Sequence, residues 1–230
     1  MKRAALIFSL VLLVGFLWWN FPTVARVKLK GCSPERAEEM KRLILPHIKG
    51  KTIFEVSIRK VARALMSHPW VRSCEIWRHW PDGLEVKVQE RRIVALLQQK
   101  GRLWCLDQDG MPFKPWERDD PWNLPVVSGL RAGELEKAQD LVSLIVALQD
   151  HPLFKRYGVA EIYWGGERGA VVVTEERGIF VYMGKEGWSQ KLKRLTWVWR
   201  YLKERGLEAR YFLCEGPDRI VVGLRRGEHG

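Results

Sequence analysis

The stretch HPWVRSCEIWRHWPDGLEVKVQERR, residues 68–92, constrains the fold of this chain more than any other segment. In its second half, apolar Leu84, Val86 and Val88 alternate with polar residues, which is the period-two pattern of a strand with one buried face. Its first half, Val71–Trp77, is rich in residues that favour strands. The stretch therefore predicts two antiparallel strands, each with one face in a core and one face in water.

The tetrapeptide Trp80-Pro81-Asp82-Gly83 separates these two strands. Proline fixes φ at the first central position of a turn, aspartate tolerates the second, and glycine readily adopts the left-handed conformation. Pro81, Asp82 and Gly83 are therefore predicted to form the structural turn of a hairpin, with Gly83 left-handed.

Three tryptophans, Trp70, Trp77 and Trp80, lie among the charged residues of this stretch. A platform for single-stranded nucleic acid would interleave exposed aromatic and basic residues, which this pattern does not require. The chain also contains no phosphate-binding loop and no zinc-finger spacing. We therefore expect the tryptophans to pack against neighbouring helices, and we predict no nucleic-acid partner.

A strand and two helices are predicted before the hairpin. Val24–Leu29 alternates like a half-buried strand, and Ser33 followed by Pro34 is typical of a helix N-cap and first helical position. A second helix is predicted to begin near Ser57 and to end at Pro69. The apolar residues at helical spacing are Ala37, Met40, Leu43 and Ile44 in the first helix and Ile58, Val61, Ala62, Leu65 and Met66 in the second.

The N-terminus reads MKRAALIFSLVLLVGFLWWNFP, with an uncharged run from Ala4 to Trp19 that would be about 24 Å long as a helix. Two interpretations compete, a retained membrane anchor and a cleaved secretory signal with a cleavage site at Thr23-Val24-Ala25; both place the remainder outside the cytoplasm. The anchor is favoured because Trp18 and Trp19 suit the membrane–water interface.

The formal charge of +12 is concentrated near this end of the chain. Residues 27–95 carry 15 basic and 8 acidic residues, a net charge of +7. This excess suits either contact with anionic lipid headgroups or a solvated surface without a partner.

The four cysteines, Cys32, Cys74, Cys105 and Cys214, form no C-x-x-C pair, which argues against a zinc site. Outside the cytoplasm they can pair as disulfides in three ways, or remain free thiols in strands. Free thiols are the favoured interpretation, and the disulfide state stays open.

The distal part of the chain is predicted to be rich in strands, with two helices at Leu135–Leu148 and Trp188–Glu204. Asp107-Gln108-Asp109-Gly110 is predicted to be a tight turn rather than a calcium loop, because the further ligands of such a loop are missing. The predicted strands are Trp104–Leu106, Met111–Phe113, Val159–Trp164, Ala170–Thr174, Ile179–Met183, Arg210–Leu213 and Arg219–Leu224.

No catalytic constellation is found in the sequence. The five histidines make no H-E-x-x-H, and Ser128 lies in VVSGL rather than in G-x-S-x-G. We therefore predict that the protein is not an enzyme and needs no cofactor or metal, although an unrecognised cell-wall enzyme stays a minor alternative.

The predicted order of strand, helix, helix, strand, strand after an apolar run resembles a POTRA module. The resemblance extends to the FtsQ/DivIB family of bacterial cell-division proteins, over about half of the chain. The segments that carry it are VARVKLKG (Val24–Gly31), KTIFEVSIRKVARAL (Lys51–Leu65), HPWVRSCEIWRHWPDGLEVKVQERRIVALL (His68–Leu97), LWCLDQDGMPF (Leu103–Phe113) and LPVVSG (Leu124–Gly129).

The resemblance implies an α+β protein with a single transmembrane helix, a β-α-α-β-β POTRA domain and a mixed β domain with two helices. The expected parts are a short cytoplasmic tail (1–3), a transmembrane anchor (4–21), the POTRA domain (24–95), the FtsQ-type β domain (96–225) and a tail (226–230).

The resemblance also implies a non-enzymatic scaffold of the divisome at the division septum. Such a scaffold is anchored in the cytoplasmic membrane with its large domain outside, and it links early and late division proteins. It binds the coiled-coil proteins FtsB and FtsL to control septal wall synthesis. The alternative is an anchored or secreted POTRA chaperone-like module for the export of outer-membrane proteins.

In the family, the last strands of the β domain offer an open edge to which the coiled-coil partner adds a strand. Here the corresponding segment is RYFLCEGPDRIVVGL, and it departs from the family at Leu213-Cys214-Glu215, where many members have Asp-Leu-Arg. The residues expected to contact the partner are Tyr211, Phe212, Ile220, Val222 and Leu224.

Overall fold

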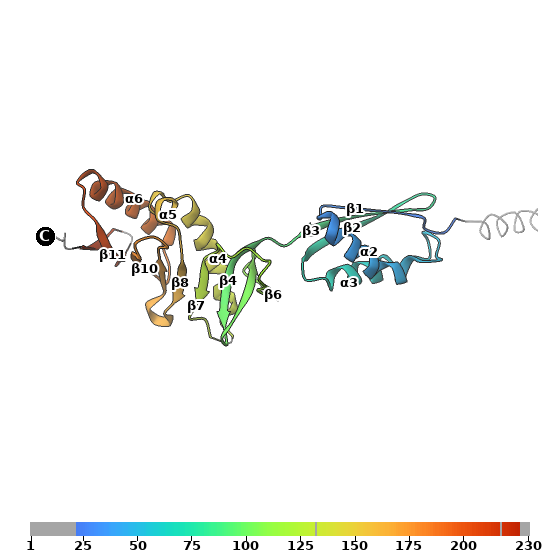
Figure 1. Cartoon of the computed structure of the whole chain (residues 1–230), viewed down its shortest axis with the longest axis horizontal. Coiled ribbons are helices and arrows are strands. Elements are labelled where there is room, and N and C mark those ends of the chain that lie inside the picture. The colour runs from blue at the N-terminus through green and yellow to red at the C-terminus, as the bar shows by residue number, and fades with distance from the viewer. Residues whose placement is uncertain (1–21, 132, 217, 226–230) are drawn as a thin grey trace, which may run out of the picture. The chain divides into compact units, whose positions relative to one another are not determined.

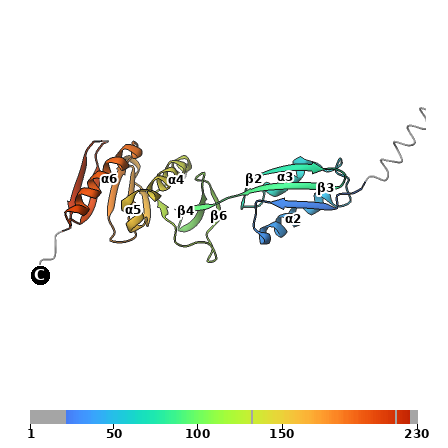
Figure 2. The same ribbon diagram turned by 90° about the horizontal axis from the view of Figure 1, so that it is seen from above.

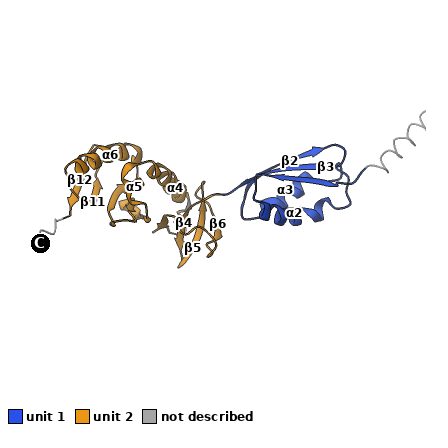
Figure 3. Cartoon of the chain, turned by 45° about the horizontal axis from the view of Figure 1, so that its top comes forward, with its two compact units in different colours: residues 1–91 blue, residues 92–230 orange. Residues whose placement is uncertain are grey.

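The computed structural model describes residues 22–131, 133–216 and 218–225 (Figure 1). The chain divides between Arg91 and Arg92 into two compact units (Figure 3). Within the described residues, no helix has the length and apolarity needed to cross a membrane. The predicted anchor, residues 4–21 with Trp18 and Trp19, lies outside the described residues, as do the tails 1–3 and 226–230.

Unit 1 has the predicted order of strand, helix, helix, strand, strand. Its elements are β1 (Arg26–Lys30), α2 (Pro34–Ile48), α3 (Ile58–Met66), β2 (Val71–His79) and β3 (Gly83–Glu90). The sheet order is β1-β3-β2, with β1 parallel and β2 antiparallel to β3. Figures 1 and 2 show both helices on one face of this sheet.

The core of unit 1 lies between these helices and the sheet, as the apolar spacing predicted. Met40 and Ile44 of α2, Val61 of α3 and Val86 of β3 are all fully buried. Burying one such side chain stabilises a fold by about 1.5–3 kcal/mol. The prediction that β3 has one buried face and one wet face is confirmed.

The hairpin turn joins β2 to β3, but its conformation differs from the predicted one. The Trp80–Pro81 peptide bond is cis, and Gly83 does not have a positive φ. Gly83 instead begins β3 opposite His79, whose Cβ and carbonyl oxygen would lie 3.0 Å from a Cβ at position 83. The prediction of a left-handed Gly83 is therefore wrong; the close approach of His79 explains the glycine.

Asp82 connects this turn to the first strand of unit 1. Its carboxylate accepts a hydrogen bond from the Arg26 guanidinium at 2.5 Å, and its carbonyl oxygen accepts one from the Ala25 N–H at 3.1 Å. The turn thus fixes the beginning of β1 beside β3.

The expected packing of the three tryptophans against the helices holds for one of them. Trp70 is half-buried, with the guanidinium of Arg36 on α2 3.7 Å from its ring centre. Trp77 is 44% exposed and Trp80 is 74% exposed. Trp77 follows Ile76 in β2, so the pleat places it on the face away from the helices, while Trp80 lies in the turn. The prediction is wrong for these two residues.

Unit 2 contains one nine-stranded sheet with the order β12-β11-β10-β9-β8-β7-β4-β5-β6. Its strands are β4 (Ile93–Gln99), β5 (Arg102–Asp107), β6 (Pro112–Pro115), β7 (Val126–Ser128), β8 (Glu161–Trp164), β9 (Ala170–Val173), β10 (Phe180–Gly184), β11 (Ala209–Cys214) and β12 (Ile220–Leu224). The sheet is mixed, because β4–β7, β7–β8 and β10–β11 pair in parallel and the other neighbours are antiparallel.

Within the described part of unit 2, three α-helices, not the predicted two, cover one face of this sheet: α4 (Leu135–Gln149), α5 (Pro152–Tyr157) and α6 (Trp188–Glu204). A 3-10 turn, η1 (Gly166–Arg168), joins β8 to β9. Figures 1 and 2 show the three helices following one another along one side of the strands. The short helix α5 has its own start signal, because Pro152 occupies the first position and the His151 ring accepts the N–H of Leu153.

The predicted turn at residues 107–110 is confirmed. The Gly110 N–H donates to Asp107 O at 3.0 Å, and the Asp107 carboxylate accepts the N–H groups of Asp109 and Met111 at 2.9 Å. A Cβ at Gly110 would lie 2.6 Å from the backbone of Gln139 in α4. Glycine is required here because the turn packs directly against that helix.

All four cysteines are free thiols in this structure. Cys74, Cys105 and Cys214 lie in strands, and Cys32 lies between β1 and α2. Burial raises the pKa of the Cys105 thiol and of the Cys214 thiol to about 11.

Candidate partner-binding edge

The strand β12 ends the large sheet of unit 2. Among the described residues it pairs with β11 on one side and with no strand on the other. The opposite terminal strand, β6, begins and ends with proline, which has no N–H to donate and so opposes strand addition. β12 contains no proline, so its outer edge is the better acceptor for an additional strand.

The hydrogen bonds to β11 define which backbone groups of β12 face outward. The Glu215 N–H donates to Arg219 O at 3.1 Å, and the Arg225 N–H donates to Glu208 O at 2.8 Å. Because backbone groups alternate sides along an antiparallel ladder, residues 221 and 223 also face β11. The N–H and C=O groups of residues 220, 222 and 224 therefore point away from the sheet, where a partner strand can bond to them.

Phe212 belongs to the core and not to the predicted contact surface. It has no exposed area, and it lies in register with Val181 of β10 and Val222 of β12. Residues in register share a face of a sheet, and the helices cover this one. Phe212 is therefore corrected from a contact residue to a core residue.

The other predicted contact residues have different surroundings. Ile220 and Val222 are half-buried at the margin of the core, since β12 has no neighbour on its outer side. Leu224 is exposed at the end of the strand. Tyr211 is exposed on the face opposite to Phe212, so it is available to a partner only on that second face.

Tyr211 lies across β12, over Gly223. A Cβ at Gly223 would lie 2.1 Å from Cε1 of the Tyr211 ring. The two residues are also register partners. Only glycine therefore fits at this position of β12 while the tyrosine ring keeps its place.

Tyr211 belongs to a larger group that the sequence analysis did not identify. We call it the aromatic face; it consists of Tyr163, Phe180, Tyr182 and Tyr211, which are between 38 and 47% exposed. Phe180 pairs with Tyr211 in register and stacks on Tyr182, with ring centres 6.5 Å apart. The signal was present in the sequence, because Phe180 and Tyr182 alternate with the buried Val181 and Met183.

The helix α6 fixes this end of the sheet through polar contacts. The buried ammonium group of Lys191 donates to Met183 O of β10 at 2.7 Å, and the Trp188 indole N–H donates to Gly184 O at 2.9 Å. A buried cation is costly unless it is hydrogen-bonded, so these contacts hold α6 in one register against the strands. Leu192, Leu195, Trp199 and Leu202 of the same helix are buried in the core, at the spacing typical of one helix face.

The described residues contain no group of three or more His, Cys, Asp or Glu side chains placed to hold a metal ion. The features that unit 2 presents are an open strand edge and an exposed aromatic face. Unit 2 is preceded in the chain by the β-α-α-β-β module of unit 1.

Comparison with known families identifies both modules. The family model "POTRA domain, FtsQ-type" matches residues 23–91, and the model "Cell division protein FtsQ/DivIB, C-terminal" matches residues 95–212. The chain belongs to the FtsQ/DivIB family of bacterial cell-division proteins.

Curated relatives agree with this assignment. The chain is 30% identical to the cell division protein FtsQ of Anaeromyxobacter sp. strain K over 218 residues, which covers 89% of the chain and 73% of the relative. It is 28% identical to FtsQ of Geotalea daltonii over 182 residues, covering 76% of the chain and 66% of the relative. It is 25% identical to FtsQ of Geobacter sp. strain M21 over 225 residues, covering 91% and 82%.

The assignment decides against the alternative of a POTRA module for outer-membrane export, because the distal unit also matches a cell-division family. Neither matched model is that of a catalytic family. The matched region ends at residue 212, so β12 and its outer edge lie beyond it.

Proposed function

We propose that the chain is a non-enzymatic scaffold of the divisome that binds coiled-coil partners of the FtsB and FtsL type through β12. The observation that carries the proposal is the outward direction of the N–H and C=O groups of residues 220, 222 and 224. A partner segment that adds as a further strand gains backbone hydrogen bonds along this edge, and its alternate side chains supply selectivity.

The contact surface in this proposal consists of the outer edge of β12 with Ile220, Val222 and Leu224, and of Tyr211 on the aromatic face. Each of these side chains lies at or beside the strand edge and has solvent-accessible area. A strand bound to β12 would also cover the exposed flank of Ile220 and Val222 and so complete the core at this margin.

The proposed organisation places residues 1–3 in the cytoplasm, residues 4–21 in the cytoplasmic membrane, and a POTRA domain (24–95) and a β domain (96–225) outside. Such a chain links division proteins on the two sides of the membrane at the septum and places septal wall synthesis under their control. Protease treatment of spheroplasts tests the topology. The extracytoplasmic units should be digested while the membrane segment is spared, and a mature N-terminus at Arg26 would contradict a retained anchor.

Site-specific crosslinking in dividing cells tests the proposed edge. A photoreactive amino acid replaces Leu224, which is exposed at the end of β12; a matched variant carries it at Trp122, which is 78% exposed and lies outside the strands of the sheet. We expect FtsB-type or FtsL-type proteins to be captured from position 224 and not from position 122. Equal capture from both positions, or capture of outer-membrane precursors alone, would contradict the proposal.

A further inference from the structure

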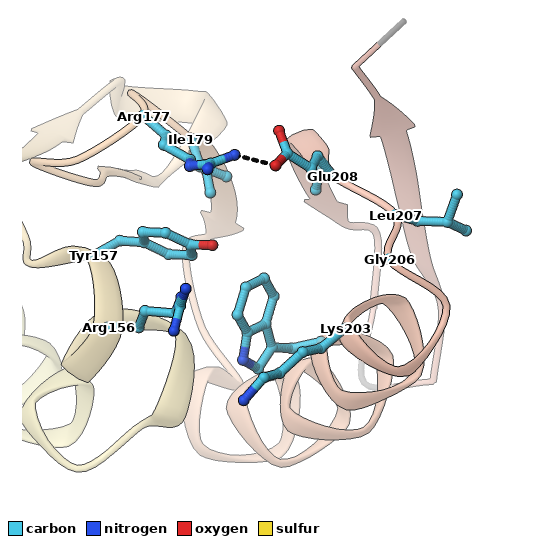
Figure 4. A pocket seen from close by; sticks show the side chains of 10 residues that line it. Arg156, Tyr157, Arg177, Ile179, Lys203, Gly206, Leu207 and Glu208 are labelled. Atoms are coloured by element: carbon cyan, nitrogen blue, oxygen red, sulfur yellow. Dashed lines mark ion pairs between the residues drawn. The ribbon is translucent and has the colours of Figure 1, made fainter. Parts of the chain in front are cut away.

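A hollow of about 150 Å³ lies in unit 2 between the end of α5, the end of α6 and the beginning of β11 (Figure 4). At about 30 Å³ per water, this is the volume of about five waters, which is enough for one carboxylate side chain. We call it the cationic pocket, and its charged and aromatic lining residues are Arg156, Tyr157, Arg177, Trp199, Lys203 and Glu208.

The pocket has more positive than negative charge. Arg156, Arg177 and Lys203 line it, and Glu208 is the acidic residue in its wall. Glu208 forms an ion pair with Arg177, drawn as a dashed line in Figure 4. Glu176 also acts electrostatically on Arg177 but does not line the pocket. Within the described chain, Arg156 and Lys203 therefore have no carboxylate partner.

The wall between these cations is aromatic. The rings of Tyr157 and Trp199 meet edge to face with centres 5.4 Å apart, and Trp199 is 9% exposed. The guanidinium groups of Arg156 and Arg177 lie 5.5 and 6.0 Å from the centre of the Tyr157 ring. Because apolar walls reduce screening by water, a carboxylate in this pocket is attracted more strongly than one beside the same cations on an open surface.

The backbone at Arg177 is unusual for a residue with a long side chain. Its φ is 64°, in the left-handed region that non-glycine residues rarely occupy. Such a conformation is retained where the surrounding structure holds it, and it is enriched at functional sites. Here it places the Arg177 guanidinium beside Glu208 at the pocket (Figure 4).

The end of β12 adjoins this pocket. Arg225, the residue after β12, donates its N–H to Glu208 O at 2.8 Å and its guanidinium to Arg177 O. Neighbouring strands in a sheet are about 4.8 Å apart, and a strand added to β12 would be three such spacings, about 15 Å, from β10. An extended segment of about five residues can span this distance. A partner segment that leaves this end of the edge therefore reaches the pocket.

We propose that the cationic pocket binds one aspartate or glutamate side chain of the polypeptide that adds to β12, at a position within about five residues of the added strand. The inference rests on the proposed function, because it assigns partner chemistry to the same surface. The backbone hydrogen bonds along the β12 edge are independent of the partner's sequence. The cationic pocket adds a charged contact at the end of that edge.

Binding measurements with the full-length chain in detergent test this inference, with the extracytoplasmic segment of the FtsB-type protein of the same bacterium as the probe. Replacing Arg156 and Lys203 together by glutamine should weaken binding about tenfold at low salt, since each partly exposed ion pair changes affinity a few fold. The weakening should shrink at high salt. The matched control replaces Lys193 and Arg200 of α6, which lie outside the pocket, and should change affinity less than twofold.

A second pocket variant and a variant of the β12 edge distinguish failure of this inference from failure of the proposed function. Arg177→Gly removes the guanidinium but suits the left-handed backbone, so it should weaken binding while the fold persists. Each Asp or Glu near the probe's added strand is replaced in turn by Asn or Gln. One of these replacements should weaken binding to the native chain but not to the Arg156 and Lys203 variant.

Equal effects of the pocket and control variants, or a pocket that binds inorganic phosphate without influence on the probe, would overturn the inference. Undiminished binding after Val222→Pro, which removes an outward N–H of β12, would instead overturn the proposed edge. If removal of residues 226–230 strengthens probe binding, Glu228 of this chain competes for the pocket, and the assignment to a partner fails.

Discussion

Alanine substitution of the neighbouring residues Phe212 and Tyr211 tests the strand orientation on which the partner-binding edge depends. Phe212 has no exposed area, whereas Tyr211 is 38% exposed on the opposite face of β11. Loss of a fully buried phenylalanine costs about 3–5 kcal/mol, because it leaves a cavity as well as removing apolar contacts. Loss of the exposed ring costs about 1 kcal/mol, mainly its cross-strand contacts with Phe180 and Gly223.

These costs translate into different melting temperatures. For a unit of 139 residues (92–230), 1 kcal/mol shifts Tm by about 4 °C, so Phe212→Ala should lower Tm by about 12–20 °C and Tyr211→Ala by about 4 °C. Urea unfolding followed by tryptophan fluorescence gives the free energies, and partner binding is measured on the folded fraction. Equal destabilisation by the two substitutions, or a Phe212→Ala variant with unchanged Tm, would refute the orientation.

Three further predictions concern the interior of unit 2. Gly110→Ala should cost more than Gly101→Ala, although both glycines have a φ of 73°, because a Cβ at position 110 would meet the α4 backbone and one at 101 meets nothing within 4 Å; a difference below about 1 kcal/mol in urea unfolding would contradict the contact. Cys105 and Cys214 should resist iodoacetamide at pH 8 until the protein unfolds, because burial raises the pKa of each thiol to about 11; mass spectrometry of native and denatured samples checks this. Burial lowers the pKa of His151 below 6.5 in the folded protein, so the unfolded chain takes up a proton at this residue at a higher pH than the folded chain does. The free energy of unfolding should therefore be complete above pH 6.5 and should fall as the pH decreases below it. Urea unfolding at pH 7.5 and 5.5 should show a larger loss for the native chain than for His151→Asn, which keeps an N-cap but does not titrate.

The order of the elements in unit 1 and the antiparallel pairing of β2 with β3 were predictable because local patterns specify them. Alternation in Leu84–Val88 defines a buried face, and the N-cap at Ser33 followed by Pro34 defines the start of α2. These signals act over a few residues and do not depend on distant parts of the chain.

The turn and the tryptophans of unit 1 were less predictable. Proline followed by Asp-Gly suits a turn with left-handed glycine, but the observed turn has a cis peptide bond before Pro81 and an extended Gly83 against His79. The exposure of Trp77 follows from the pleat once β2 is placed, and composition alone does not supply that placement.

The candidate site was predicted on the last strands, and the structure shows that β12 ends the sheet, but one side chain, Phe212, was assigned incorrectly. The alternation in Tyr211-Phe212-Leu213 shows that these residues cannot share one face, so Phe212 and Tyr211 were separable from the sequence. The cationic pocket was not predictable, because it combines α5, α6, the β9–β10 turn and the start of β11. Such a site requires the tertiary fold.

Amide hydrogen exchange along β12, measured residue by residue by NMR with and without the FtsB-type segment, tests the central claim most directly. In the free protein the N–H groups of residues 221 and 223 should already be protected, whereas those of residues 220, 222 and 224 should exchange quickly. Saturation with the partner should slow exchange at residues 220, 222 and 224. Unchanged exchange at these three amides under saturating partner would contradict strand addition at β12.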